Sequence, residues 1–454
     1  MSNYSLSIAP TKENIKDSIY NDILGNNKWI SDFLTLFLST DDSIIALNGK
    51  WGSGKTFLAK KMQEIINNKF NSQLGIENDI FINNTFKNLN SDSCFAIYYN
   101  AWEYDNENNP IVSFLYYLLK TLGHKIHSDK FKQIIENFIS NVVEKISCGW
   151  VKIKSDGKKS NLEEVLSSVI TSDYIYEEIS GLLQELRSER CNKLVIIIDE
   201  LDRCRPNYAL KVIEMLNHYF KRDGILVLCM IDFEQLSNMI KTSYGTKTNA
   251  IMYLDKIFDM RFNIPEIDSI ESYINFKVGT DYDDRYFFDT ICTEIIKEKN
   301  LTLRNIDRFL SYIKILFSEF KKHSDFDFPV KGLIMYFFTP YLISSLLFDL
   351  DEFDRIMQFD FTNIVSFCNR YRVNERINQI YNYSQNKDKA NNSVIENLKT
   401  DLTTIIMHMK DKNNDATSLI VGKSYQAIHY LDKLDLLTLV IERVSGESDG
   451  NKKL

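Results

Sequence analysis

Residues 49–56 carry the clearest chemical signature in the chain. They read GKWGSGKT and match the pattern GxxxxGK[ST] at every position. The glycines let successive backbone N–H groups turn inward and approach phosphate oxygens closely. Lys55 can reach the β- and γ-phosphates of a nucleotide, and the hydroxyl of Thr56 can bind Mg²⁺. The sequence therefore predicts a site for a nucleoside triphosphate together with Mg²⁺.

Two acidic residues follow the most apolar run of the chain, residues 194–198 (LVIII). Asp199 stands where a carboxylate holds Mg²⁺, directly or through water. Glu200 is placed to polarise a water molecule for in-line attack on the γ-phosphate. The alternative is a solvated acid pair at the end of a strand.

Two further positions could contact the nucleotide. Asp232 follows the apolar run 225–231 and could sense the γ-phosphate or hold the attacking water, or it could cap a helix that starts at Phe233. Arg304 and Arg308 are spaced by one helical turn. A guanidinium there could stabilise charge on the γ-phosphate, or it could lie on a solvated helix face.

The roles of three other residues stay open at this stage. Trp102 is expected to pack a helix against the sheet, with contact to nucleotide or a partner as the alternative. Asp202 and Arg203 are expected to form a local charge pair. Arg203 could instead act as an arginine finger toward a neighbouring subunit.

The pattern around these residues predicts the elements that position them. Apolar, β-rich runs occur at residues 43–48, 95–99, 194–198, 225–231 and 258–264, and helical patterns lie between them. This alternation predicts an α/β fold, a P-loop NTPase with a mainly parallel five-stranded sheet. The run 95–99 lies between the two motifs in sequence, which suits the branch with an extra strand between the Walker A and Walker B strands.

We predict four regions along the chain. Residues 1–105 hold an N-terminal helix and the first half of the P-loop domain, and residues 106–190 form a helical insertion. Residues 191–266 complete the P-loop domain. Residues 267–454 form an all-α C-terminal region that could act as a lid or bind a partner.

Composition narrows the class of protein. The chain has 454 residues and a formal net charge of −8, so it is a poor general binder of polyanions. Seven cysteines without a CxxC pair fit a reducing compartment, and we expect a cytoplasmic location. The uncharged run 332–348 is interrupted by Pro340 and favours a buried helical core over a membrane span.

Several segments resemble the KAP family of P-loop NTPases. They are the phosphate loop with Trp51, residues 100–105 (NAWEYD), 199–204 (DELDRC), 230–236 (MIDFEQL), 253–258 (YLDKIF) and Arg304. The resemblance covers about residues 15–315. The chain departs from the family pattern in two ways: Glu200 replaces the commoner Asp, and the insertion lacks the long apolar helices that many members carry. A membrane span is therefore not expected, and the chain resembles a soluble bacterial member.

The resemblance implies an ATPase that cleaves a phosphoanhydride bond with ATP and Mg²⁺ bound. The implied catalytic residues are Glu200, Lys55 and Arg304, and the implied metal ligands are Thr56 and Asp199. The implied nucleotide contacts are Gly49, Trp51, Gly52, Ser53, Gly54, Lys55, Thr56, Phe57 and Asp232.

The leading hypothesis is a switch that controls a partner effector. Several bacterial members of the family belong to phage-defence loci, so the resemblance also implies anti-phage defence. Homo-oligomerisation stays open. The alternatives are a small-molecule phosphotransferase, a nucleotide-dependent scaffold, and a DNA-remodelling or loading ATPase. The last alternative depends on Lys152, Lys154, Lys158 and Lys159, which also fit a solvated loop.

Overall fold

The computed structural model describes residues 9–73, 86, 94–106, 110, 113, 114, 117, 192–221, 223–265, 267, 269–279, 285–321, 331–371, 373–383 and 394–410. The chain divides into two compact units, one spanning Ile8–Asp268 and one that includes the chain from Ser269 onward. Most of the predicted insertion, residues 106–190, lies outside the described residues.

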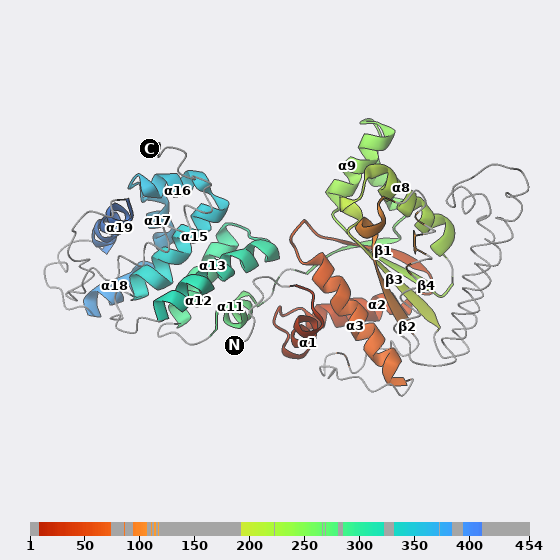
Figure 1. Ribbon diagram of the computed structural model, residues 1–454, viewed down its shortest axis with the longest axis horizontal. Helices are drawn as coiled ribbons and strands as arrows, with labels where there is room; N and C mark the ends of the chain where they lie inside the picture. Colours follow the sequence, from red (N-terminus) through yellow and green to blue (C-terminus); the bar gives the residue numbers. More distant parts are fainter. Residues whose placement is uncertain are drawn as a thin grey trace, which may run out of the picture. The chain divides into compact units, whose positions relative to one another are not determined.

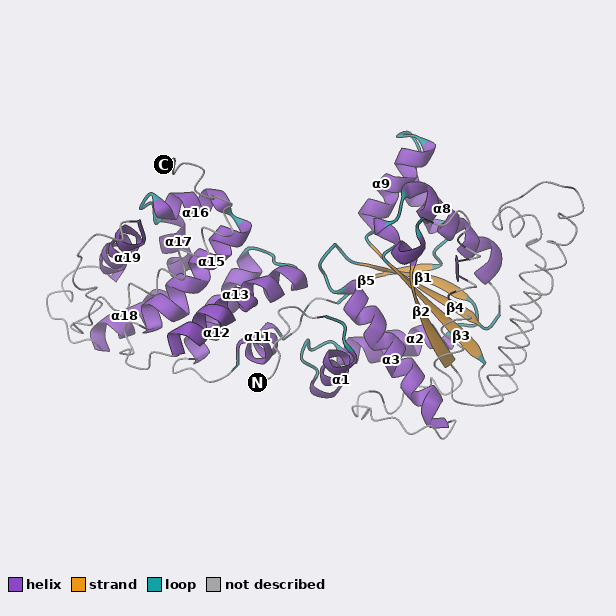
Figure 2. Cartoon of the chain, in the orientation of Figure 1, coloured by secondary structure: helices purple, strands orange, loops and turns teal. Residues whose placement is uncertain are grey.

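The first unit is built on a five-stranded parallel sheet, which confirms the predicted fold class (Figure 2). The strands are β1 (Ser43–Asn48), β2 (Cys94–Asn100), β3 (Lys193–Asp199), β4 (Ile225–Ile231) and β5 (Met260–Asn263). Their order in the sheet is β2-β3-β4-β1-β5. Every neighbouring pair is parallel, so the carboxyl ends of the strands meet at one edge.

The extra strand between the two motif-bearing strands is β4. It pairs with β1 on one side, with Ile44 opposite Val227, and with β3 on the other, with Ile196 opposite the same residue. The segment at 95–99, which lies between the motifs in sequence, forms the edge strand β2. The strand predicted at 258–264 is shorter in the structure, because β5 covers only Met260–Asn263.

Helices cover both faces of this sheet (Figure 1). The helices of the unit are α1 (Lys12–Asn21), α2 (Asn27–Ser39), α3 (Lys55–Gln73), α8 (Pro206–Met215), α9 (Phe233–Tyr244) and α10 (Ala250–Asp255), with short helices η2 (Ala101–Tyr104), η3 (Leu201–Arg203) and η4 (Leu216–Phe220). On one face, the Lys60 ammonium of α3 lies 5.1 Å from the centre of the Tyr98 ring. On the other, Ile213 and Leu236 join the core cluster with Ile196. Burial on both faces explains why β3 and β4 are continuous apolar runs.

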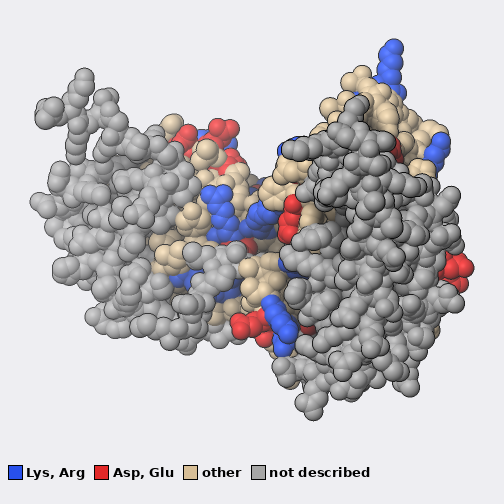
Figure 3. Space-filling view, turned by 45° about the vertical axis from the view of Figure 1, so that its right-hand side comes forward, with Lys and Arg blue, Asp and Glu red and all other residues tan. Residues whose placement is uncertain are grey.

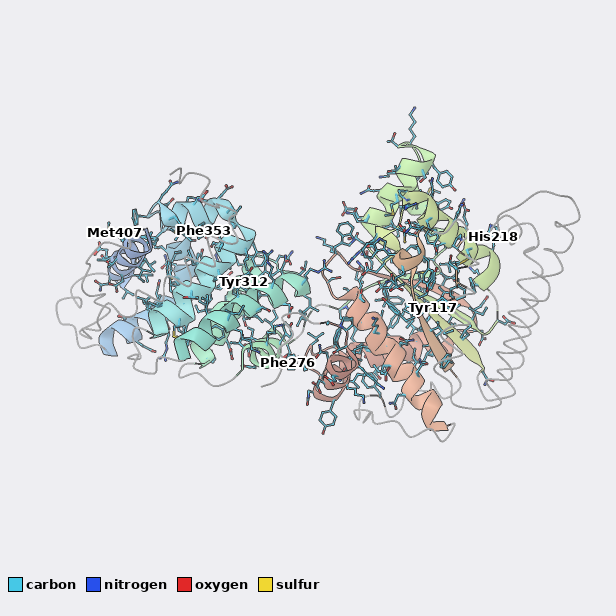
Figure 4. All side chains as sticks on the ribbon, viewed as in Figure 1. Tyr117, His218, Phe276, Tyr312, Phe353 and Met407 are labelled. Carbon is cyan, nitrogen blue, oxygen red and sulfur yellow. The ribbon has the colours of Figure 1, made fainter. Side chains whose placement is uncertain are left out.

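Two polar contacts fix elements of this unit around the sheet. Tyr117, labelled in Figure 4, donates a hydrogen bond to the carbonyl of Tyr98. The ammonium of Lys61 on α3 is fully buried and donates to the carbonyl and hydroxyl of Ser18 and to Oδ1 of Asn26 at 2.8–3.2 Å. Burial lowers the pKa of Lys61 to about 8. Lys61 therefore ties the helix that follows the phosphate loop to α1.

The second unit is helical throughout its described residues, as predicted. Its helices are α11 (Ile270–Val278), α12 (Arg285–Glu298), α13 (Leu303–Lys321), η5 (Lys331–Phe338), α15 (Thr339–Phe348), α16 (Leu350–Met357), α17 (Thr362–Arg370), α18 (Val373–Tyr383) and α19 (Val394–Lys410). The Lys277 ammonium lies 2.7 Å from Oδ1 of Asp307, which also accepts from the Tyr273 hydroxyl at 2.7 Å.

The uncharged run at 332–348 forms η5 and α15 and packs in the interior of the second unit, as predicted. Residues 333–346 are all buried. Among the residues that the structure describes, no helix combines the length and apolarity needed to cross a bilayer.

Candidate functional site

The phosphate loop connects β1 to α3 at the carboxyl edge of the sheet. Gly52 and Gly54 have positive φ angles of 82° and 93°, which glycine adopts without steric cost. A Cβ atom at Gly49 would lie 2.5 Å from Cδ1 of Ile264 and 2.7 Å from Oγ of Ser53. Close packing at Gly49 and left-handed backbone at the other two explain why the loop contains glycine at these positions.

Lys55 begins α3 and its side chain turns back onto the loop. It is buried, and its ammonium donates to the Gly49 carbonyl at 2.7 Å and to Oδ2 of Asp202 at 3.4 Å. The indole N–H of Trp51 donates to the same carboxylate oxygen at 2.6 Å. Asp202 is therefore the buried counter-ion of Lys55, a contact that sequence reasoning missed because the two residues lie on separate elements.

Asp202 also leaves one oxygen available. The residue is 1% exposed, and its Oδ1 is buried without a hydrogen-bond partner among the described residues. A buried unsatisfied carboxylate oxygen is costly unless a bound group completes its hydrogen bonds. The unpartnered Oδ1 of Asp202 therefore indicates that a ligand with polar atoms would fit this site.

Asp199 is the last residue of β3 and is fully buried. It accepts from the Tyr98 hydroxyl at 2.9 Å and from the main-chain N–H of Glu200 at 2.8 Å. Burial raises the pKa of Asp199, and hydrogen bonding by Thr56 and these two donors opposes that rise. A carboxylate buried this deeply is stabilised in its ionised form by a nearby cation.

Glu200 leaves the end of β3 with a left-handed backbone, φ 60°. Its Oε1 accepts from the Thr56 hydroxyl at 3.2 Å, and its Oε2 forms an ion pair with Nε of Arg203. Burial and the neighbouring Asp199 raise the pKa of Glu200, while Arg203 lowers it. The structure thus brings Thr56, Asp199 and Glu200 together.

Asp232 adopts the capping geometry that was its alternative interpretation. Its Oδ1 accepts from the main-chain N–H of Gln235 at 3.3 Å at the start of α9. Asn48, which the sequence did not single out, accepts from the N–H of Phe233 at 3.0 Å and donates to Oδ1 of Asn263 at 2.9 Å. A contact of Asp232 with nucleotide stays a prediction.

The contacts described so far do not include two predicted site residues, Phe57 and Arg304. The Phe57 side chain is 6% exposed and belongs to the core, so only its main chain could meet a phosphate. Arg304 is exposed on the first turn of α13, in the second unit. Its role toward the γ-phosphate stays a prediction.

Two expectations about residues 102 and 203 are wrong. Trp102 is 50% exposed, so it does not form core packing between helix and sheet; its ring faces the guanidinium of Arg203 at 5.6 Å. Arg203 pairs with Glu200 and not with Asp202. In the tight turn of η3, positions 200 and 203 face the same side, whereas Asp202 points toward the phosphate loop.

A glycine loop at the carboxyl end of β1, a basic residue at the start of the next helix and acids at the end of β3 define a P-loop NTPase site. The KAP family P-loop domain matches residues 26–320, and the chain belongs to this family. No curated protein matches the chain. Membership of this P-loop family supports nucleotide binding.

Proposed function

We propose that this protein is a Mg²⁺-dependent ATPase of the KAP type that acts as a switch on a partner effector. The observation that carries the proposal is the meeting of Thr56, Asp199 and Glu200 beside the phosphate loop that holds Lys55. A carboxylate and a hydroxyl are oxygen ligands that suit Mg²⁺, and a second carboxylate beside them can act as a base.

The residues present fit a magnesium-bound triphosphate. The loop from Gly49 to Thr56 offers main-chain N–H groups, and the fully buried Asp199 and the unpartnered Oδ1 of Asp202 both lie where polar ligand atoms would offset their burial. Thr56 and Asp199 would hold the metal, which would supply charge neutralisation on the phosphates when bound.

The remaining proposed roles belong to the chain itself. Lys55 would exchange its contact with Asp202 for the β- and γ-phosphates, and Glu200 would accept the proton of the attacking water. As the water oxygen bonds to the γ-phosphorus, the bond to the β–γ bridging oxygen breaks. Asp232 and Arg304 are proposed to contact the γ-phosphate. ATP is favoured over GTP because the sequence contains no NKxD motif.

The test separates binding from hydrolysis. Lys55→Ala should abolish nucleotide binding measured by calorimetry, because the loop loses its cation; the exposed Lys50→Ala in the same loop is the matched control. Glu200→Gln should keep binding but reduce phosphate release by about 10²-fold or more, the usual contribution of a general base. Equal phosphate release by Glu200→Gln and the wild type would remove Glu200 from this role.

The proposals about the effector and the biological setting depend on the family resemblance. We propose that the effector is a protein that binds one nucleotide state, and that the pair acts in bacterial anti-phage defence. Comparing which proteins co-purify with Glu200→Gln and with Lys55→Ala would test this, because only the former should be held in the ATP state. A partner retained equally by both variants would argue against a nucleotide switch. The cytoplasmic location stays a prediction.

No observation on the described residues specifically favours the DNA-remodelling or phosphotransferase hypothesis. The lysines at 152, 154, 158 and 159, on which the DNA-remodelling hypothesis depends, lie outside the described residues. On the described part of the face in Figure 3, Lys and Arg are interspersed with Asp and Glu. For a phosphotransferase, the γ-phosphate would appear on an acceptor and not as free phosphate, which the same assay with labelled ATP would detect.

A further inference from the structure

We infer that Arg203, supported by the ring of Trp102, is a positioning residue for Glu200, an inference that rests on the ATPase function proposed above. The two side chains form an ion pair through Nε of Arg203 and Oε2 of Glu200. Neither the motif pattern nor the predicted role of Arg203 as an arginine finger includes this contact.

The two oxygens of Glu200 have different partners. Oε1 accepts from the Thr56 hydroxyl at 3.2 Å, and Oε2 is held by Arg203. Thr56 is also a predicted metal ligand, and a hydroxyl could bind a metal through an oxygen lone pair while its O–H still donates to Oε1. The second lone pair of Oε1 would accept a hydrogen bond from a water molecule while Oε2 stays on the guanidinium, which fixes the direction of the base.

The backbone gives an independent reason why Glu200 needs this support. Its φ of 60° places it in the left-handed region, which a residue other than glycine adopts at a steric cost. The following turn η3 brings residue 203 back beside residue 200. The conformation that aims Glu200 at the phosphate loop is therefore the one that places Arg203 within reach.

Trp102 holds the other side of the guanidinium. Its position is set by Asn100, the last residue of β2, whose Oδ1 accepts from the main-chain N–H of Trp102 at 3.2 Å. The ring centre lies 5.6 Å from Cζ of Arg203, within the range of a cation–π contact. A half-exposed tryptophan thus has a defined contact, and Arg203 is held between an aromatic face and a carboxylate.

The test uses steady-state ATP hydrolysis by the full chain. Arg203→Gln should lower kcat by about 10-fold or more, a cost typical of a misplaced catalytic group, with KM and nucleotide Kd little changed. Arg203→Lys should restore part of the lost kcat, because a cation is again available to Oε2 of Glu200. Trp102→Leu should lower kcat by less than Arg203→Gln does, with KM again little changed.

Arg205→Gln is the matched control, because Arg205 is exposed and its side chain contacts Asp105 and Asn106 instead of Glu200. An Arg203→Gln enzyme with unchanged kcat, or one whose loss of activity lies in KM and nucleotide Kd and is not restored by Arg203→Lys, would overturn the inference. Recovery of activity on mixing Arg203→Gln with Lys55→Ala would instead show an arginine finger acting on a neighbouring subunit. Wild-type protein without ATPase activity would overturn both proposals, whereas a fully active Glu200→Gln would remove Glu200 while leaving hydrolysis in place.

Discussion

At the scale of single residues, the site depends on groups that are held by more than one contact. Asp202 receives both the Trp51 indole and the Lys55 ammonium on one oxygen, so the conformation of the loop and the position of its lysine are coupled. Glu200 is similarly held between Thr56 and Arg203. Substitution of any one of these side chains should therefore alter the conformation of the phosphate loop.

Gly49 offers a steric test of this loop. Gly49→Ala would place Cβ 2.5 Å from Cδ1 of Ile264 and 2.7 Å from Oγ of Ser53, so the loop must shift. We expect nucleotide affinity to fall by about 10-fold or more, since the main-chain donors lose their alignment. Calorimetric titration with Mg-ATP of the Glu200→Gln background would measure it.

The control for that substitution is Gly245→Ala, which has a positive φ of 97° and open space around the added atom. It should lower stability without altering nucleotide affinity. The double variant Gly49→Ala, Ile264→Ala should recover part of the lost affinity. If it does not, steric overlap with Ile264 is not the cause.

Residue types and spacing predicted where the phosphate loop and its acids would be, because glycine, lysine, hydroxyl and carboxylate are constrained by the chemistry of a magnesium-bound triphosphate. The partners of Trp51, Asp202 and Arg203 were not predictable. They depend on how η3 turns after β3 and on which side chains β1, β2 and β3 place at one edge. Which of two neighbouring acids a side chain contacts depends on tertiary geometry, and no local sequence pattern encodes that geometry.

At the scale of elements, the central strands of the sheet could be predicted from the sequence, and the edge strands could be predicted less well. The central strands β3 and β4 are buried on both faces, and their continuous apolar sequence shows this directly. The edge strand β5 alternates between partly buried and exposed residues, and among the described strands it pairs with β1 alone, so its length was overestimated. The spatial place of β2 at the edge could not be read from its position in the sequence.

The contact between α3 and α1 leads to a prediction about pH. Lys61 has a pKa of about 8 in the folded protein, below its ordinary value of 10.5, because it is desolvated. Between these values the unfolded chain binds a proton that the folded chain has released, so this group makes the protein more stable as pH rises. The slope approaches about 1.4 kcal/mol per pH unit for a single group.

Urea unfolding at about pH 7.5, below that window, and at about pH 9.5, within it, would measure the effect. The wild type should gain free energy of unfolding relative to Lys61→Met over this interval. The exposed Lys12→Met on α1 should follow the wild type. Parallel behaviour of the wild type and Lys61→Met would show that the buried ammonium does not titrate there.

At the scale of the whole molecule, each unit has a buried core and its own buried charge. The first holds Lys61 between α3 and α1, and the second holds Lys277 beside Asp307 and Tyr273. Removing the cation of a buried ion pair typically costs about 3–5 kcal/mol, because the carboxylate stays buried without it. The nucleotide, in contrast, is proposed to bind groups of the phosphate loop and of β3, which belong to the Ile8–Asp268 unit.

These separate sources of stability should be visible in calorimetry of the full chain. Lys277→Met should lower the melting temperature of one transition, that of the helical unit. Mg-ATP added to Glu200→Gln should raise the melting temperature of the other transition, because ligand at 100 times Kd stabilises the folded unit by about 2.7 kcal/mol. Nucleotide that shifts both transitions would indicate that ligand binding is coupled to the stability of the helical unit. A single transition that responds to both changes would show that the two units unfold together, and the effects of Lys277→Met and nucleotide would then simply add.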